Sequence, residues 1–375
     1  MVAKKTGVGK GLDALIPAGN KKTVVKKDSE PVIIEKIVEK KGVETLKITE
    51  VEPNREQPRK NFNEDALLEL SDSIKQYGVI QPLIVQKKQD RYEINQVTGP
   101  DEWHEPVNNN LYTNYLARWN LRYVLSLLES LKKEETDAYH ALVAKTGLTE
   151  EETAQWNVVQ EKIYLPRKEG TKLLEQFEGY FELDNVTIEK YDENDWPVRP
   201  EALKTKKTRE TQINKQADVV MLLHLMGNEF DEETIKENYA YYEKRTLHGS
   251  SLSPSIYSVM GLKVGDDSKA YRYLRRAAFL DLLNMQGNTR EGVHAANTGG
   301  VWQTIVFGFA GVSQREDGML KVCPNMPKEW QKLSFRLHYR GAWLEITSDG
   351  SNQAEVRRLA GDPVEVEVNG SVKTI

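Results

Sequence analysis

Apolar side chains recur at three- and four-residue steps from Leu111 to Leu131, which predicts an amphipathic helix of about six turns. The members of this stripe are Tyr115, Trp119, Leu121, Leu125, Leu128 and Leu131. Residues 215–226, 268–283 and 300–309 have the same spacing, and the last of these is apolar enough to be buried. The pattern predicts a mainly helical region over residues 96–315.

Near the C-terminus the period of the apolar positions changes from helical to two. Apolar residues alternate with polar ones over residues 333–339, Gly341 marks a turn, and residues 342–346 alternate back. Val364, Val366 and Val368 then lead into Asn369-Gly370, a dipeptide typical of two-residue hairpin turns. We therefore predict a small antiparallel β-domain over residues 316–375 and a mainly α fold class with β.

The N-terminal part has a different composition. Residues 1–27 carry seven lysines and one acidic residue, Asp13, within a chain of net charge −5. Such a segment favours a disordered basic tail, which either solubilises the chain or contacts nucleic acid or another acidic surface. Residues 28–47 have the composition of a linker, and residues 48–95 combine strand-like and helical patterns. We expect a tail and linker over residues 1–47 and a small α+β unit over residues 48–95.

Length and composition narrow the class of protein further. A chain of 375 residues with 39% hydrophobic and 29% charged residues is typical of two or three globular domains. The single cysteine, Cys323, excludes a disulfide framework and a cysteine-based zinc site, and favours a cytoplasmic location. The longest nearly apolar run, residues 219–226, is too short to cross a membrane, and no signal sequence follows the basic start. We expect no membrane partner.

Three motifs stand out in residues 1–94: Lys-Gly-Leu-Asp-Ala-Leu-Ile-Pro at residues 10–17, Gln-Pro-Arg at residues 57–59, and Gly-Val-Ile-Gln-Pro-Leu-Ile-Val at residues 78–85. In these motifs the segment resembles the N-terminus of chromosome-partitioning ParB proteins. In that family a Gly-Glu-Arg-Arg motif that binds nucleotide phosphate follows, and then a helix-turn-helix. Here residues 95–102 read Asn-Gln-Val-Thr-Gly-Pro-Asp-Glu, so the arginine pair is missing and we expect no tight binding of CTP.

The remainder, residues 95–375, contains four further motifs, at residues 97–114, 215–220, 247–255 and 291–303. In sequence and in order these motifs resemble those of the maltose, kojibiose and trehalose phosphorylases of glycoside hydrolase family 65. The resemblance implies the second half of an (α/α)6 barrel at residues 96–315, followed by a small antiparallel β-sandwich. It also implies inverting phosphorolysis of an α-glucosyl disaccharide to a glucose 1-phosphate. The two resemblances together imply a fusion of a ParB-like segment with a phosphorylase-like segment, and the junction lies at residues 92–96.

Two functions follow from the two resemblances. The first is a disaccharide phosphorylase, which is favoured by the greater length of chain that carries it. The alternative is a ParB-like partition module that binds a nucleotide or a partner and carries a passenger domain. The oligomeric state stays open, with a homo-oligomer as one alternative, and the Lys-rich tail leaves nucleic acid as a further partner.

By resemblance, Glu102 is the general acid. A phosphorylase needs such an acid to protonate the leaving oxygen but no carboxylate base, because phosphate is already an anionic nucleophile. The neighbouring Asp101 and Glu105 are like charges that favour the protonated carboxyl. Without the resemblance, Glu102 reads as an exposed carboxylate in the turn that follows Gly99-Pro100.

The same resemblance assigns the binding residues. Those expected at phosphate are Ser250, Ser251, His294, Gly299 and Gly300, and those expected at the sugar are Lys215, Gln216 and Trp103. Taken alone, the histidines and serines read as ordinary loop and the lysine as a solvated helix start. For Trp119 and Trp302 core packing is favoured over sugar stacking. Inorganic phosphate is the expected co-substrate, with disaccharide as the partner molecule. No cofactor or metal is expected, since His104-Glu105 lacks the spacing of a zinc helix.

The resemblance also implies what this sequence lacks. Members of the family carry an N-terminal β-sandwich and a first half-barrel, which includes a Trp-Asp pair that grips the donor sugar. We therefore expect exposed apolar helix faces that favour aggregation unless another chain covers them, and little turnover by the isolated chain.

Overall fold

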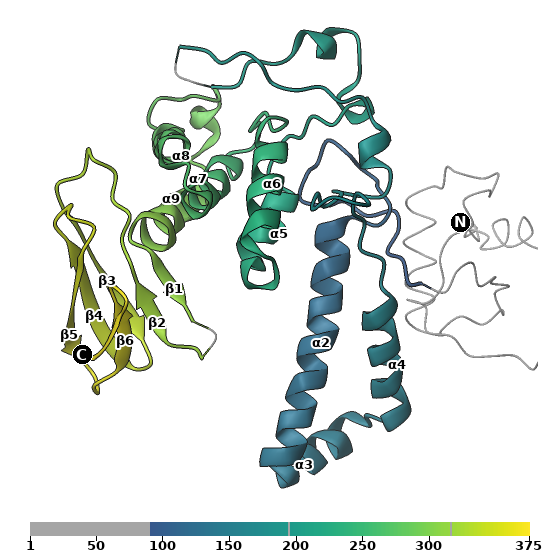
Figure 1. The fold of residues 1–375 in the computed structure, drawn as a ribbon, viewed down its shortest axis with the longest axis vertical. Coiled ribbons are helices and arrows are strands. Elements are labelled where there is room, and N and C mark those ends of the chain that lie inside the picture. The colour runs from purple at the N-terminus through teal and green to yellow at the C-terminus, as the bar shows by residue number, and fades with distance from the viewer. Residues whose placement is uncertain (1–90, 194–195, 316) are drawn as a thin grey trace, which may run out of the picture. The chain divides into compact units, whose positions relative to one another are not determined.

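The computed structural model describes residues 91–193, 196–315 and 317–375 (Figure 1). The chain divides into two compact units, residues 1–85 and 86–375, and every described residue belongs to the second. The predicted basic tail, the linker and most of the α+β unit expected at residues 48–95 lie outside the described residues.

The middle of the chain is mainly helical, as predicted. Its helices are α2 (Leu111–Glu134), α3 (Thr136–Thr146), α4 (Glu150–Lys162), α5 (Val219–Leu225), α6 (Glu232–Glu243), α7 (Ser253–Val264), α8 (Asp267–Phe279) and α9 (Ala295–Gln303). A π-helical stretch, η7 (Thr304–Phe309), continues α9. Short 3-10 turns are η2 (Tyr180–Glu182), η3 (Glu201–Lys204), η4 (Thr208–Glu210), η5 (Gly227–Glu229) and η6 (Thr289–Glu291).

Two predicted helix starts are wrong by several residues. The helix expected over residues 215–226 begins only at Val219, because the backbone before it is held by other segments. Asn214 bridges to Thr246 in a parallel fashion, and Lys215 N donates to the Asp101 carboxylate at 2.7 Å. The helix expected from Gly300 begins five residues earlier, at Ala295.

Helices α2, α3 and α4 form an arm (Figure 1). The side chain of Asn110 caps α2 by accepting from Thr113 N at 3.0 Å, and the first turn is buried. Beyond that turn the predicted apolar stripe stays partly exposed, and α3 and α4 bury none of their residues. Trp119 lies in this part and stacks on Tyr123, with ring centroids 5.1 Å apart, instead of entering the core.

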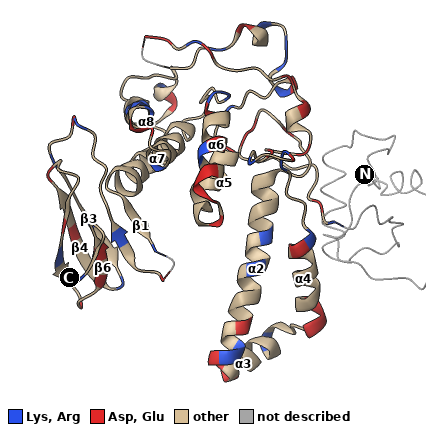
Figure 2. Cartoon of the chain, in the orientation of Figure 1, with Lys and Arg blue, Asp and Glu red and all other residues tan. Residues whose placement is uncertain are grey.

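Charges near the far end of this arm follow the helix dipoles. Glu150, Glu151 and Glu152 lie in the first turn of α4, and Lys132 and Lys133 lie in the last turn of α2 (Figure 2). Acidic groups stabilise a helix start and basic groups a helix end. These charges therefore add to the stability of α2 and α4 at the far end of the arm.

The core of the helical region lies around α5. Val219, Val220, Leu222 and Leu223 of this short helix are completely buried among residues of α2, α6, α7 and α8. Each such side chain contributes roughly 1.5–3 kcal/mol of transfer free energy on burial. None of the helices in the described part of the chain combines the length and apolarity needed to cross a membrane.

The C-terminal region consists of two sheets. In the described residues its strands are β1 (Val312–Gln314), β2 (Leu320–Val322), β3 (Leu333–Tyr339), β4 (Ala342–Ser348), β5 (Ala354–Ala360), β6 (Glu365–Val368) and β7 (Ser371–Thr374). One sheet has the order β1-β2-β6-β7 and the other the order β3-β4-β5. Aliphatic side chains from both sheets form one buried cluster, which makes the region two-layered.

Both predicted hairpins are confirmed. Tyr339 pairs with Ala342 across Arg340-Gly341, and Val368 pairs with Ser371 across Asn369-Gly370. All four turn residues have positive φ, as a two-residue turn of this hand requires. The expectation of a purely antiparallel domain is wrong at one place, because β2 pairs with β6 in parallel. That pair joins the β1–β2 and β6–β7 hairpins edge to edge, which lets the other three strands form the opposing layer.

Candidate active site

Glu102 lies in a loop that close packing holds against α5 and α2. A Cβ atom on Gly99 would lie 2.3 Å from Asn110 Nδ2 and 2.7 Å from Asp218 Oδ2, so only glycine allows this approach. The side chain of Glu102 is about half exposed, at 52%, and forms an ion pair with the ammonium of Lys215. This cation, rather than a neighbouring carboxylate, is the group that contacts the predicted acid.

Asp101 anchors this loop from inside the protein. Its buried carboxylate accepts from Lys215 N at 2.7 Å and contacts His104 Nδ1 at 2.6 Å, while its own N–H donates to Asp218 at 3.1 Å. Asp101 is thus turned away from Glu102. It fixes the loop that carries Glu102 to the segment that carries Lys215.

Two titratable groups next to Asp101 have shifted pKa values. Burial raises the pKa of Asp218 to about 7, although Asp101 N and Asn110 Nδ2 donate to its carboxylate. Burial disfavours protonation of His104, but the hydrogen bond and charge of Asp101 outweigh it and raise the pKa of His104. His104 Nε2 also lies 2.8 Å from the carbonyl oxygen of Thr211, so both ring nitrogens are engaged.

The predicted sugar-binding residues surround Glu102 on one side. Gln216 Nε2 donates to the carbonyl oxygen of Pro100, which ties the amide to the same loop. Trp103 is half-buried against the cluster of Ile188, Leu203, Ile213 and Leu247. Gly249 N donates to Lys215 O at 2.8 Å, and a Cβ atom on Gly249 would meet both Lys215 and Trp103 at about 3.5 Å. Glu102, Trp103, Lys215 and Gly249 are therefore brought together.

The predicted phosphate loop follows directly. Ser250 and Ser251 are partly buried and immediately precede α7. Ser250 O accepts from Ser253 N at 3.3 Å, and Ser250 Oγ accepts from Leu252 N at 3.4 Å. The loop begins at His248, a buried residue with φ +51°. These hydroxyls and the first N–H groups of α7 lie at one end of that helix, where the helix dipole favours an anion.

The remaining predicted phosphate residues lie on α9. His294 is the N-cap residue of α9, and its backbone N–H and Nδ1 contact the carboxylate of Asp281 at 2.8 and 2.6 Å. Gly299 and Gly300 lie inside α9 and not in front of a helix. A Cβ atom on Gly300 would lie 2.6 Å from Ser255 Oγ, which places Gly300 tightly against the first turn of α7, whereas Gly299 is exposed.

The two tryptophans expected in the core are less buried than predicted. Trp302 is 48% exposed and packs edge-on against Phe307, with ring centroids 5.4 Å apart. Trp119 lies on the arm described above. The expectation of core packing is therefore wrong for Trp302, because about half of its surface is exposed.

The sequence pattern does not assign Asp218 or His248 to the site, and it gives Asp101 only as a like charge beside Glu102. All three lie inside the motifs that carried the resemblance, but the partners named above lie 3 to 117 residues away in the chain. Only the three-residue step from Asp101 to His104 is a local signal. Among the described residues, no three His, Cys, Asp or Glu side chains converge as a metal site would require.

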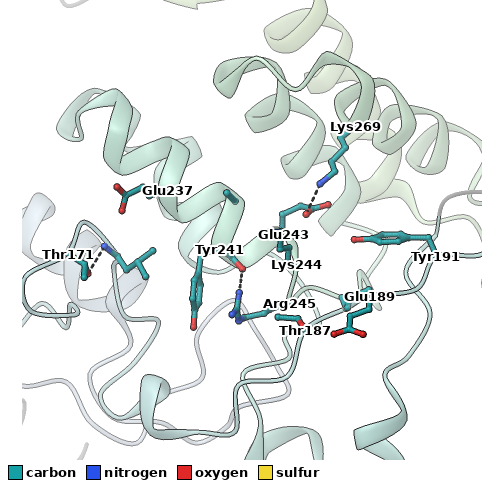
Figure 3. A pocket seen from close by; sticks show the side chains of 13 residues that line it. Thr171, Thr187, Glu189, Tyr191, Glu237, Tyr241, Glu243, Lys244, Arg245 and Lys269 are labelled. Carbon is teal, nitrogen blue, oxygen red and sulfur yellow. Dashed lines mark hydrogen bonds and ion pairs between the residues drawn. The ribbon is translucent and has the colours of Figure 1, made fainter.

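A cavity of about 800 Å³ lies apart from this loop (Figure 3). Tyr191, Tyr241, Glu243 and Lys269 belong to its lining, and the figure shows the ion pair between Glu243 and Lys269. The groups around Glu102 and Ser250 do not contribute to it.

Comparison with known proteins gives three matches to family models. The model described as glycosyl hydrolase family 65 central catalytic domain matches residues 81–303, and the family 65 C-terminal domain model matches residues 314–375. The ParB N-terminal domain model matches residues 34–99. The first and third matches overlap at residues 81–99, which include the junction predicted at residues 92–96.

Individual relatives agree with these models. A kojibiose phosphorylase of Caldanaerobacter subterraneus subsp. tengcongensis is 51% identical over 75% of this chain and 36% of its own length. An α,α-trehalose phosphorylase of Geobacillus stearothermophilus is 37% identical over 75% and 36%. A solved structure, a putative kojibiose phosphorylase from human microbiome, superposes with a TM-score of 0.66 at 30% identity, over 77% of this chain and 42% of that one. The chain spans about a third of the length of the curated relatives it matches.

Proposed function

Since the chain belongs to glycosyl hydrolase family 65, we propose that it carries the general-acid side of a disaccharide phosphorylase site. The substrate class is an α-glucosyl disaccharide with inorganic phosphate as co-substrate. The higher identity to kojibiose phosphorylases, 51% and 49% against 37% for a trehalose phosphorylase, supports kojibiose as the first substrate. Trehalose and maltose are the alternatives. The observation that carries this proposal is the contact of Glu102 with Lys215 beside Gly249 and the Ser250–Ser251 loop.

In the proposed reaction a phosphate oxygen attacks the anomeric carbon from the face opposite the glycosidic oxygen. The bond from carbon to the glycosidic oxygen breaks, and Glu102 gives its proton to that oxygen. Inversion of an α-glucoside yields β-glucose 1-phosphate and a free sugar. Ser250, Ser251, His294, Gly299 and Gly300 would surround the phosphate, and Lys215, Gln216 and Trp103 would contact the sugar.

Lys215 has a second role in this scheme. Its ammonium pairs with the carboxylate of Glu102 and so holds that side chain beside the proposed sugar-binding residues.

The proposal extends to the architecture. Residues 96–315 would form the second half of an (α/α)6 barrel, and residues 316–375 would complete the β-domain. The family 65 C-terminal match at residues 314–375 and the helices α2 to α9 support this division. A cytoplasmic location agrees with the single cysteine.

A second candidate function rests on the ParB N-terminal match at residues 34–99. In this alternative the N-terminal unit at residues 48–95 is a partner-binding module, and the lysine-rich tail contacts nucleic acid. The missing arginine pair argues against nucleotide binding as its activity. Calorimetric titration with CTP should show no binding, and a micromolar dissociation constant would favour this second function.

The proposed reaction is tested by release of glucose 1-phosphate from kojibiose and phosphate by the purified full chain. Turnover should be slow, because the chain spans about a third of the length of its relatives and positioning of the substrate contributes several kcal/mol. Glu102→Gln should lower the rate by about 10²–10⁴-fold, since an amide has no proton to give at this position. Equal release by both proteins would show that Glu102 is not the acid.

Glu105→Gln is the matched control. Glu105 accepts from Thr98 Oγ1 at 3.0 Å on the same loop, and glutamine keeps an acceptor there. The rate at which Glu105→Gln releases glucose 1-phosphate should stay within a few-fold of the parent rate. Calorimetry with inorganic phosphate gives a measure that does not need turnover, and Ser250→Ala should weaken phosphate binding.

A further inference from the structure

A buried series of polar contacts, here called the relay, connects the cavity of Figure 3 to the Ser250–Ser251 loop. Lys269 Nζ pairs with Glu243 at 2.8 Å, and Tyr273 OH donates to the same carboxylate at 3.0 Å. The Tyr273 oxygen lies 3.1 Å from His248 Nε2, and His248 Nδ1 lies 2.8 Å from Ser253 Oγ. Four elements contribute: the end of α6, the first half of α8, the loop before α7 and the first residue of α7.

The chemistry of these groups fixes the direction of each hydrogen bond. A carboxylate only accepts, so Tyr273 must donate its hydroxyl proton to Glu243. The Tyr273 oxygen is then free to accept from His248 Nε2–H. A neutral imidazole has one N–H group, so Nδ1 must accept from the hydroxyl of Ser253.

His248 is neutral for a physical reason. The residue is only 3% exposed, and burial, together with the nearby charge of Arg276, lowers the pKa of His248 to about 3. The rings of Tyr257 and Tyr273 pack on it, each with centroids 4.7 Å away, and Trp196 lies at 5.4 Å. These rings hold the imidazole in one position, and its two hydrogen bonds favour the Nε2–H tautomer.

The position of the His248 ring also affects the backbone of this residue. Its φ of +51° lies in the left-handed region, which is unfavourable for residues other than glycine and persists only where surrounding contacts hold it. The next residue, Gly249, is bonded to Lys215 O, and Ser250 and Ser251 follow. Contacts that hold the ring of His248 therefore hold the start of the loop.

We propose that Glu243 and Tyr273 are positioning residues, which keep His248 in its Nε2–H form and so hold Gly249, Ser250 and Ser251 in place to bind phosphate. This inference rests on the proposed function, because it assumes that the loop binds phosphate. Neither Glu243 nor Tyr273 needs to touch the substrate. Their effect passes through the imidazole of His248.

The tautomer is measured directly by NMR of the full chain labelled with ¹⁵N-histidine, with the His248 signals assigned through their loss in His248→Gln. We expect the neutral Nε2–H form, unchanged between about pH 5 and pH 8. Tyr273→Phe removes the acceptor for Nε2–H and should shift His248 toward a mixture of tautomers. Glu243→Gln keeps a carbonyl acceptor for Tyr273 and should keep the Nε2–H form.

Phosphate binding is measured on the same proteins by calorimetry with inorganic phosphate. Tyr273→Phe should weaken the affinity by about 3–10-fold, the range expected for one lost hydrogen bond. Tyr271→Phe makes the same change on the same helix, where the ring packs near Phe309, and should leave both the tautomer and the affinity unchanged.

The outcomes separate this inference from the proposed function. An unchanged His248 tautomer in Tyr273→Phe, or equal phosphate affinity in the two tyrosine variants, would overturn the relay while leaving phosphate binding intact. Absence of phosphate binding in every protein, the parent included, would overturn the proposed function and with it this role of the relay. A tautomer shift together with weaker binding in Tyr273→Phe alone supports the proposal.

Discussion

The helical region and the C-terminal β region bury different kinds of side chain. Around the candidate site, Asp101, His104, Asp218, Glu243 and His248 are all buried. The buried cluster between the two sheets consists of Val, Leu, Ile and Ala side chains. Apolar packing is non-directional and tolerates small shifts, whereas a buried charge is stable only while each of its partners is in place. The buried polar and charged groups of the helical region thus carry a desolvation cost that the aliphatic cluster of the β region does not.

This difference has a consequence for pH. Burial holds the pKa of Asp218 near 7 and that of His248 near 3, so the stability of the helical region depends on pH. The aliphatic cluster between the sheets contains no group that titrates. Substitutions in the two regions should therefore differ in size and in how they respond to pH.

The largest expected effect on stability belongs to the β region. Leu344 is completely buried at the centre of β4, opposite Leu337 of β3. Leu344→Ala should lower the free energy of unfolding by about 2–5 kcal/mol, because it removes apolar contacts and leaves a cavity. The loss should be the same at pH 5 and pH 8 in urea denaturation.

Leu359→Ala is the control for this prediction. Leu359 is 38% exposed on β5, and its truncation should cost much less than that of Leu344. Equal losses from the two variants would mean that the sheets do not pack as a two-layered core.

The second prediction concerns the pH dependence of stability that Asp218 gives to the helical region. The folded pKa of Asp218, about 7, lies above the value of about 3.9 expected for an unfolded aspartate. The folded state thus binds the proton more tightly, and the stability this gives is full below about pH 4 and is lost as pH rises to about 7. Between pH 5 and pH 8 the parent should lose about 2–3 kcal/mol relative to Asp218→Asn.

Urea denaturation of both proteins at several pH values measures this difference. Asp349→Asn in the β region is the control, because a hydrogen bond from Ser351 lowers the pKa of Asp349 and keeps it ionised throughout this range. Parallel pH profiles for the parent and Asp218→Asn would show that Asp218 is not buried as a proton-binding group.

The same contrast explains what could be predicted from the sequence. The hairpins at Gly341 and at Asn369-Gly370 follow from alternation and turn chemistry within a dozen residues, and both are confirmed. The stripe from Leu111 to Leu131 predicted α2 equally well. Local periodicity predicts an element correctly where residues close in the sequence determine its conformation.

The site could be predicted only through its motifs. The resemblance named Glu102 and Lys215, but the contacts of Asp101 with Lys215 N and of His248 with Tyr273 join residues 114 and 25 positions apart. No period or turn signal reports such pairs. For the same reason the pattern predicts too early a start for α5, because the hydrogen bond from Lys215 N to Asp101 helps to keep residues 214–218 out of the helix.

Two neighbouring glycines of α9 test how closely this helix packs against α7. Gly300→Ala would place a Cβ atom 2.6 Å from Ser255 Oγ and should destabilise the protein by about 1–3 kcal/mol. A Cβ atom on Gly299 meets no atom within 4 Å, so Gly299→Ala should stabilise the helix by about 0.5–1 kcal/mol.

Phosphate binding adds a second readout to this pair. If Gly299 lines the phosphate site, Gly299→Ala should raise the melting temperature and yet weaken phosphate binding in calorimetry. A more stable variant with unchanged affinity would remove Gly299 from the proposed site.

The smallest loss of stability is expected at the turn between β6 and β7. Gly370 has φ +79° with no atom within 4 Å of a Cβ position, so Gly370→Ala tests backbone conformation without a clash. A left-handed conformation costs a residue with a Cβ atom about 1–2 kcal/mol, and the loss should not vary with pH. Gly370→Asn should recover most of it, because asparagine tolerates this region. If urea denaturation shows the two variants to be equally unstable, the loss does not come from the left-handed conformation, and the β region is less tolerant of its side chains than the comparison with the helical region implies.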